Sequence, residues 1–192
     1  MPESSPLPAQ YSVQPIYNYQ WVGIDGATAS CQAILQAGTY ATMQNNALSY
    51  GFWYEFYPKD SWLMDEPDIS PGDSVFVQVK AHNTTSGYAY MKNLSTGKDI
   101  TINLEAPAGS SLCDSTAEWI QENATGGNSG DAGLAPFNTF SFDYCHALDV
   151  SGNNYNLRGS EKWFMQPNGN TICYPSNVLG GSVQINYNGP RA

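Results

Sequence analysis

Short segments of alternating side chains most restrict how this chain can fold. In residues 17–25, for example, Tyr17, Tyr19 and Trp21 share one face of an extended strand. Segments of this kind recur at 17–25, 31–40, 49–58, 75–81, 88–94, 100–104, 116–123, 137–148, 163–166, 171–174 and 182–187. No segment has the period of an amphipathic helix. We therefore predict an all-β fold, an antiparallel β-sandwich of two packed, curved sheets of the concanavalin-like or jelly-roll type.

The length of the chain suits one sizeable core. It has 192 residues, of which 41% are hydrophobic, without a break in composition. We expect a single domain over 1–192, with the Pro- and Ser-rich residues 1–10 as a disordered or extended lead-in. A formal net charge of -10 disfavours nucleic acid and anionic membrane surfaces as partners. No apolar run is long enough for a transmembrane helix. We expect a monomer.

The charged residues are few and mostly acidic. They make up 12% of the chain, with 17 acidic against 7 basic residues. Once the carboxylates are protonated, little positive charge remains to repel itself, which favours tolerance of acid. A secreted β protein with a Ser-, Thr- and Asn-rich surface would have the same composition, and the two interpretations are compatible.

Two features indicate an oxidising, secretory route. Sequons for N-glycosylation begin at Asn83, Asn93 and Asn123, and the cysteines number four. Met1 is followed by PESSPLPAQ, which is not a signal peptide. We therefore expect a secreted, extracellular protein whose leader, and possibly propeptide, is missing from this chain.

Three polar side chains lie within strands that otherwise read as buried. Glu118 follows Thr116 and precedes Ile120 on one face, and burial there would raise the pKa of a carboxylate and suit it to acid/base chemistry. Glu55 lies in the most aromatic segment, and Gln36 in an apolar one. The simpler alternatives are a carboxylate that caps a strand end or meets a lysine, and a buried amide bonded to backbone.

Other kinds of site find little support. His82 and His146 are far apart, and no Cys or His pair has the spacing of a zinc site. Neither a GxSxG serine motif nor a Gly-rich phosphate loop is present. We therefore expect no metal and no cofactor.

Six strings in order resemble the fungal glutamic peptidases, also called eqolisins. They are WVGIDGAT at 21–28, AILQAG at 33–38, WYEFYP at 53–58, SPGD at 70–73, NLSTG at 93–97 and AEWIQE at 117–122. The resemblance implies a β-sandwich and an acid-active, secreted endopeptidase that needs no metal. Its polypeptide substrates would be cleaved by water that a Glu and Gln dyad activates.

Matched position by position, the resemblance assigns roles to six residues. The dyad corresponds to Gln36 and Glu118. Residues expected to hold the dyad in place or to line the cleft are Trp21, Asp25, Glu55 and Tyr57.

The chain departs from the family pattern in two places. Tyr40 stands where family members commonly carry an Asp shortly after the dyad Gln, so an acid beside the site is missing or replaced. The chain also lacks a first strand containing NWAG, which implies either a truncated chain or a shortened paralogue. A lost strand would leave an unpaired edge.

A different class of function is also open. A non-catalytic β-sandwich could bind polysaccharide on an aromatic face containing Trp53, Tyr54, Tyr57 and Trp62. A secreted structural protein with a decayed site is a third possibility. Convergence of Gln36 and Glu118 in one cleft would favour the peptidase.

Two expectations concern pairs of residues. Gln36 and Glu118 should lie on neighbouring strands with both side chains on the concave face, close enough to share a water. Of three possible cysteine connectivities, we expect Cys31 to pair with Cys113 and Cys145 with Cys173, because the first two each precede a dyad residue by five positions.

Overall fold

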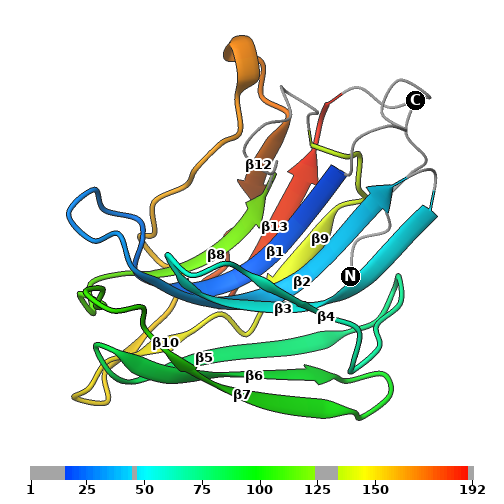
Figure 1. The fold of residues 1–192 in the computed structure, drawn as a ribbon. Helices are drawn as coiled ribbons and strands as arrows, with labels where there is room; N and C mark the ends of the chain where they lie inside the picture. The colour runs from blue at the N-terminus through cyan, green and yellow to red at the C-terminus, as the bar shows by residue number, and fades with distance from the viewer. Residues whose placement is uncertain (1–15, 45–46, 124–133, 190–192) are drawn as a thin grey trace.

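Strands account for almost all regular structure in the computed structural model (Figure 1), which describes residues 16–44, 47–123 and 134–189. The strands are β1 (Ile16–Ile24), β2 (Ile34–Gln44), β3 (Ala47–Tyr57), β4 (Trp62–Met64), β5 (Val75–Asn83), β6 (Ser86–Asn93), β7 (Asp99–Glu105), β8 (Ala117–Glu122), β9 (Phe140–Asp143), β10 (Ala147–Leu148), β11 (Asn154–Tyr155), β12 (Cys173–Ser176) and β13 (Ser182–Tyr187). A 3-10 turn covers Pro167–Gly169. The expected lead-in, 1–10, lies outside the described residues.

A five-stranded antiparallel sheet forms one layer of the molecule. Its strand order is β4, β3, β2, β1, β8, so β2 lies at its centre, β8 at one edge, and β1 between the two. β2 and β3 are the longest strands and pair along their whole length, from Ile34 opposite Tyr57 to Gln44 opposite Ala47. The sheet is strongly curved (Figure 1). Its two faces are therefore a concave and a convex surface.

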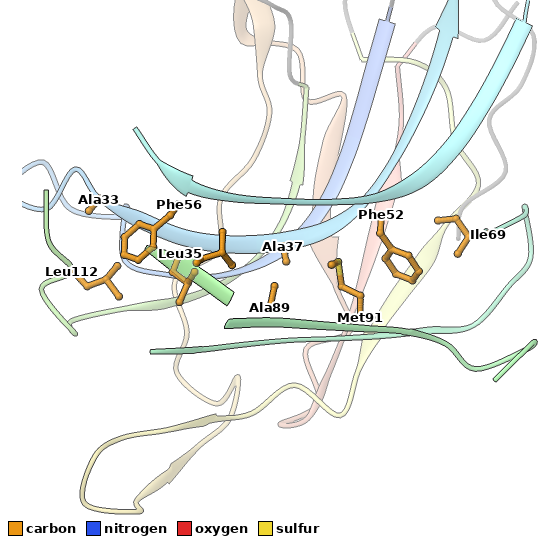
Figure 2. Close-up of a cluster of buried hydrophobic side chains, with 10 residues drawn as sticks. Ala33, Leu35, Ala37, Phe52, Phe56, Ile69, Ala89, Met91 and Leu112 are labelled. Atoms are coloured by element: carbon orange, nitrogen blue, oxygen red, sulfur yellow. The ribbon is translucent and has the colours of Figure 1, made fainter. Parts of the chain in front are cut away.

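The convex face of this sheet packs on the three-stranded sheet of β5, β6 and β7. Leu35 and Ala37 of β2 and Phe52 of β3 are fully buried, and they meet Ala89 and Met91 of β6. Figure 2 shows these side chains between the two layers, on the convex side of the curved sheet. Burial of each large apolar side chain contributes about 1.5–3 kcal/mol. Alternate residues of β2 and β3 thus form the core on the convex face, and the residues between them lie on the concave face.

A second core belongs to the three-stranded sheet with order β12, β13, β9. Its buried residues include Phe137, Val183 and Ile185, and Trp119 of β8 packs against them. The convex side of β8 therefore rests on this second sheet. Antiparallel pairing throughout the described strands and the packed layers confirm the predicted all-β sandwich. A single domain over all 192 residues stays a prediction.

One of the two expected disulfides is present. Cys31 and Cys113 are bonded, with their Cα atoms 6.1 Å apart, and they join the segments before β2 and β8. The pairing of Cys145 with Cys173 is wrong, because both are free and buried. β13 separates them, since Ser182 at one end of β13 pairs with Asp143 of β9, whereas Tyr187 at the other end pairs with Cys173. Opposite ends of a sheet are too far apart for a disulfide.

Among the described residues, none forms a helix with the length and apolar character needed to span a membrane.

Candidate active site

Four residues of the concave face form one row across four strands. Gly23 of β1 pairs with Gln36 of β2 on one side and with Glu118 of β8 on the other. Glu55 of β3 pairs in turn with Gln36. Directly opposed residues of antiparallel strands point to the same face, so Gln36 and Glu118 face each other across a residue without a side chain. The two are not on neighbouring strands as expected, because β1 lies between them.

Gly23 keeps the middle of this row open. A Cβ atom built on Gly23 would lie 2.8 Å from Cζ3 of Trp21 and 3.5 Å from Cβ of Gln36. The first distance is shorter than van der Waals contact allows. A side chain at this position would therefore collide with Trp21 and fill the space between the two polar side chains.

Glu118 is a partly buried carboxylate with no hydrogen-bond partner in the described structure. Both of its oxygens are buried and neither accepts a hydrogen bond. Burial raises the pKa of Glu118 to about 7, and the charge of Asp25 adds to this, whereas the nearby Thr116 hydroxyl, which is outside hydrogen-bond geometry, lowers it slightly. Such a group can take up and release a proton in mildly acidic or neutral water.

Gln36 is held by Glu55. The Gln36 side chain is 5% exposed, and its Nε2 donates a hydrogen bond to Oε2 of Glu55. Oε1 of Gln36 is buried and has no partner among the described residues. Burial raises the pKa of Glu55 to about 7, although the bond from Gln36 lowers it. Glu55 therefore fixes the amide while leaving one oxygen and one N–H of Gln36 for another molecule.

Trp21 packs beside the row and is fixed by a residue that the sequence did not single out. Its Nε1 donates to Oε2 of Glu122 at 2.8 Å, and its ring packs in a cluster with Tyr19, Tyr40 and Trp53. Burial also raises the pKa of Glu122. The sequence does contain a sign of this role, because residues 118, 120 and 122 share a face in an extended AEWIQE segment, which puts Glu122 on the face of Glu118.

Tyr40 stands on the concave face in a row with other residues. It pairs with Tyr19, which pairs with Glu122, and on its other side it pairs with Gly51. Tyr40 is 4% exposed, and a Cβ on Gly51 would lie 2.6 Å from its ring. A buried ring thus occupies position 40, and the carboxylate in this row is Glu122.

Asp25, the residue that follows β1, supports the site by binding the loop that precedes β8. It is fully buried and accepts hydrogen bonds from the backbone N–H groups of Cys113, Asp114 and Ser115 at 2.7, 2.9 and 2.8 Å. Burial opposes ionisation, but the bonds from Ser115 and its neighbours outweigh it and lower the pKa of Asp25. A charged anchor therefore fixes the chain just before Glu118.

Tyr57 lies at the end of β3 and is 44% exposed. It shares the face of Glu55, two residues earlier, by strand alternation. Its exposed ring is available to line the concave side near the row.

The aromatic residues do not form one exposed face suited to stacking on sugars. Trp53 is 1% exposed, and Tyr54 packs against the core on the convex side. Trp62 is exposed but pairs with Tyr54, so it is on the convex side, opposite to Trp53 and Tyr57. The polysaccharide alternative thus loses the surface on which it depended.

Within the described part of the chain, no group of three or more His, Cys, Asp or Glu residues is placed to hold a metal ion.

Comparison with known proteins finds similarity to two fungal proteins, aspergillopepsin-2 and scytalidopepsin B. The chain is 34% identical to aspergillopepsin-2 of Aspergillus niger over 167 residues, which cover 87% of this chain and 58% of the relative. It is 40% identical to scytalidopepsin B of Scytalidium lignicola over 124 residues, which cover 63% of this chain and 46% of the relative. The chain thus spans about half the length of these relatives.

Solved structures are similar over most of the chain. Aspergilloglutamic peptidase from Aspergillus niger superposes with a TM-score of 0.78 at 32% identity, covering 89% of this chain and 98% of the other. Scytalido-glutamic peptidase with a transition state analog inhibitor gives a TM-score of 0.81 at 31% identity, covering 97% and 88%. The sequence profile of the peptidase A4 family matches residues 2–187. The chain therefore belongs to the peptidase A4 family, the glutamic peptidases or eqolisins.

Proposed function

We propose that this protein is a secreted, acid-active endopeptidase that hydrolyses peptide bonds with a water activated by Glu118 and Gln36. One observation carries the proposal. Both oxygens of Glu118 and Oε1 of Gln36 are buried without a partner in the described structure, and they flank Gly23 on the same face. Buried polar atoms without partners are costly, so these three are suited to bind a water or a substrate group.

The spacing of the strands leaves room for one water between the side chains of Gln36 and Glu118. Two strand spacings separate the Cα atoms of Gln36 and Glu118, which amounts to about 10 Å. Both side chains point to the concave face and can reach toward each other above Gly23. A water between them would donate one hydrogen bond to Oε1 of Gln36 and another to Glu118, which leaves the free N–H of Gln36 for the substrate.

Glu118 would act first as a base and then as an acid. Its carboxylate takes a proton from the water, and the water oxygen attacks the carbonyl carbon of the peptide bond. The C–N bond then breaks, and the proton passes from Glu118 to the leaving amine. A hydrogen bond from the water stabilises the ionised carboxylate, so the base form extends into acid when water is bound.

Gln36 would stabilise the negative oxygen that forms during attack. Its amide is neutral at every pH, so its N–H donates equally well in acid. Glu55 accepts the other N–H and holds the amide in place. Trp21 would restrict the same space from the side, since its ring contacts the position above Gly23. Asp25 acts at a distance by fixing the segment before β8.

The relatives support a polypeptide substrate. One solved eqolisin is in complex with the tripeptide Ala-Ile-His, and it covers 97% of this chain at 29% identity. The exposed ring of Tyr57, on the same face as Glu55, would line the cleft in which such a chain lies.

A proteolysis assay on a denatured protein substrate tests the proposed reaction. We expect cleavage in acid and no effect of EDTA. Cleavage should fall as pH rises through about 7, where Glu55 ionises and places a negative charge beside the amide that stabilises the oxyanion. Cleavage that is strongest near pH ~8 or abolished by EDTA would instead require a serine or metal mechanism.

A further inference from the structure

The structure distinguishes between two of the three sequons. Asn83 ends β5, and Asn93 ends β6 of the same sheet. The sequon of Asn123 continues into residues outside the described part of the chain. N-glycosylation joins a sugar to the side-chain nitrogen of asparagine, so the surroundings of that nitrogen determine whether the folded protein can carry a glycan.

The nitrogen of Asn93 is part of the interior. Asn93 is fully buried, and its Nδ2 donates to the backbone oxygen of Asp68 at 3.0 Å and to Oδ2 of Asp73 at 2.9 Å. Its Oδ1 accepts from the backbone N–H groups of Ser95 and Thr96 at 2.9 and 3.2 Å. Both N–H hydrogens are in use. A sugar on this nitrogen would break the bonds that hold the loop before β5 to the turn after β6.

The surroundings of Asn83 are different, because this residue is at the surface. Asn83 is exposed and pairs with Ser86 in the tight hairpin between β5 and β6. Its Oδ1 accepts from the backbone N–H of Thr85 at 2.8 Å and from the Thr85 hydroxyl at 3.0 Å. Nδ2 donates to no other described residue. The hydroxyl that defines the sequon is therefore already beside the amide, and the residue that would carry the glycan is exposed.

We propose that Asn83 is an N-glycosylation site of this protein and that Asn93 is not modified. The donor is a lipid-linked oligosaccharide pyrophosphate of the secretory pathway. A bond forms between Nδ2 and the anomeric carbon of N-acetylglucosamine, Nδ2 loses one proton, and the lipid pyrophosphate leaves. The proposal rests on the secretory route of the proposed function, but not on the dyad.

A glycan at Asn83 would leave the proposed cleft free. The hairpin belongs to the sheet of β5, β6 and β7, which covers the convex side of the five-stranded sheet (Figure 1). Gln36 and Glu118 face the concave side. Loss of the glycan should therefore leave proteolysis unchanged.

The test is to express the chain in yeast behind a secretion leader, which imposes the route on the protein. Total protein from cells and medium is treated with an N-glycosidase in heavy-oxygen water and mapped by peptide mass. We expect the mass label at Asn83 and none at Asn93. Thr85→Ala should lose the label at Asn83, and Thr85→Ser, which keeps the sequon hydroxyl, should retain it.

An unlabelled Asn83 in the wild type, or a labelled Asn93 in folded protein, would overturn the assignment. Asn83→Gln provides a second variant, which should lose the label and keep the acid proteolysis of the wild type. Because the leader supplies the route, an inactive but glycosylated chain would contradict the proposed peptidase and leave the assignment of Asn83 supported.

Discussion

Gly23 lies between the side chains of Gln36 and Glu118, and its missing side chain is what lets the two converge. We expect Gly23→Ala to lower kcat by about 100-fold, since a misplacement of ~1 Å in an active site costs that much. The added methyl would force Trp21 from its place. The strand should persist, because alanine is tolerated in extended backbone.

Gly181→Ala is the matched control for this substitution, since a Cβ there has nothing within 4 Å. It should keep wild-type kcat and melting temperature. Equal activity of Gly23→Ala and Gly181→Ala would show that the open row has no part in the reaction.

The single side chain of Asp25 fixes the segment that leads into β8. We expect Asp25→Asn to destabilise the fold by about 1.5–3 kcal/mol, the range for hydrogen bonds to a charged group. The amide would present N–H groups toward the backbone N–H groups of Cys113 and Ser115. Urea denaturation measures this loss, and an unchanged midpoint would refute the anchoring role.

A polar ladder holds the three strands of the site in register from the opposite face. The Thr39 hydroxyl donates to Oε1 of Gln20 at 3.0 Å, and Nε2 of Gln20 donates to Oε1 of Gln121 at 2.8 Å. These residues of β2, β1 and β8 are opposite one another. The ladder is thus a second link between the strands that carry Gln36 and Glu118.

Removing one member of this ladder should cost more than removing all three. Gln20→Leu leaves the partners on both sides unsatisfied, which costs about 1–3 kcal/mol. Combining it with Thr39→Val and Gln121→Leu removes the polar atoms together and should recover most of that loss. Chemical denaturation of the single and triple variants decides the point, and a triple variant less stable than Gln20→Leu would contradict it.

The sequence predicts elements better than it predicts their order in the sheet. Alternation gave the right faces for Gln36, Glu55 and Glu118, because the period of a strand is a local property. It could not show that β1 lies between β2 and β8, since strand order depends on contacts far apart in the chain. The same limit explains the wrong pairing of Cys145 with Cys173. The position of Glu122 on the concave face, by contrast, could have been predicted, because it shares a strand face with Glu118.

At the scale of the whole molecule, the buried carboxylates make stability depend on pH. Burial raises the pKa of Glu55 and Glu118 to about 7, so the folded state keeps protons that the unfolded chain loses. Stability is then highest where both states are protonated and falls as pH rises from the ordinary carboxyl range to about 7. Asp25 has a lowered pKa and acts oppositely, so its contribution is lost as pH falls through its folded pKa.

Melting temperatures between about pH 4 and about pH 8 check this balance. The double variant Glu55→Gln and Glu118→Gln should show a flatter decline toward neutral pH than the wild type. Glu161→Gln, at an exposed position, should keep the wild-type slope. Parallel slopes for all three proteins would mean that the two carboxylates do not titrate as buried groups.

The most direct test of the central claim is the turnover of Glu118→Gln in acid, at about pH 4, with Glu161→Gln as the control. The substitution keeps the shape of the side chain and removes only its capacity to carry a proton. We predict a loss in kcat of about 10²–10⁴-fold for Glu118→Gln, with wild-type folding and full activity in the control. Peptide cleavage by Glu118→Gln at the wild-type rate would contradict the assignment of Glu118 as the base.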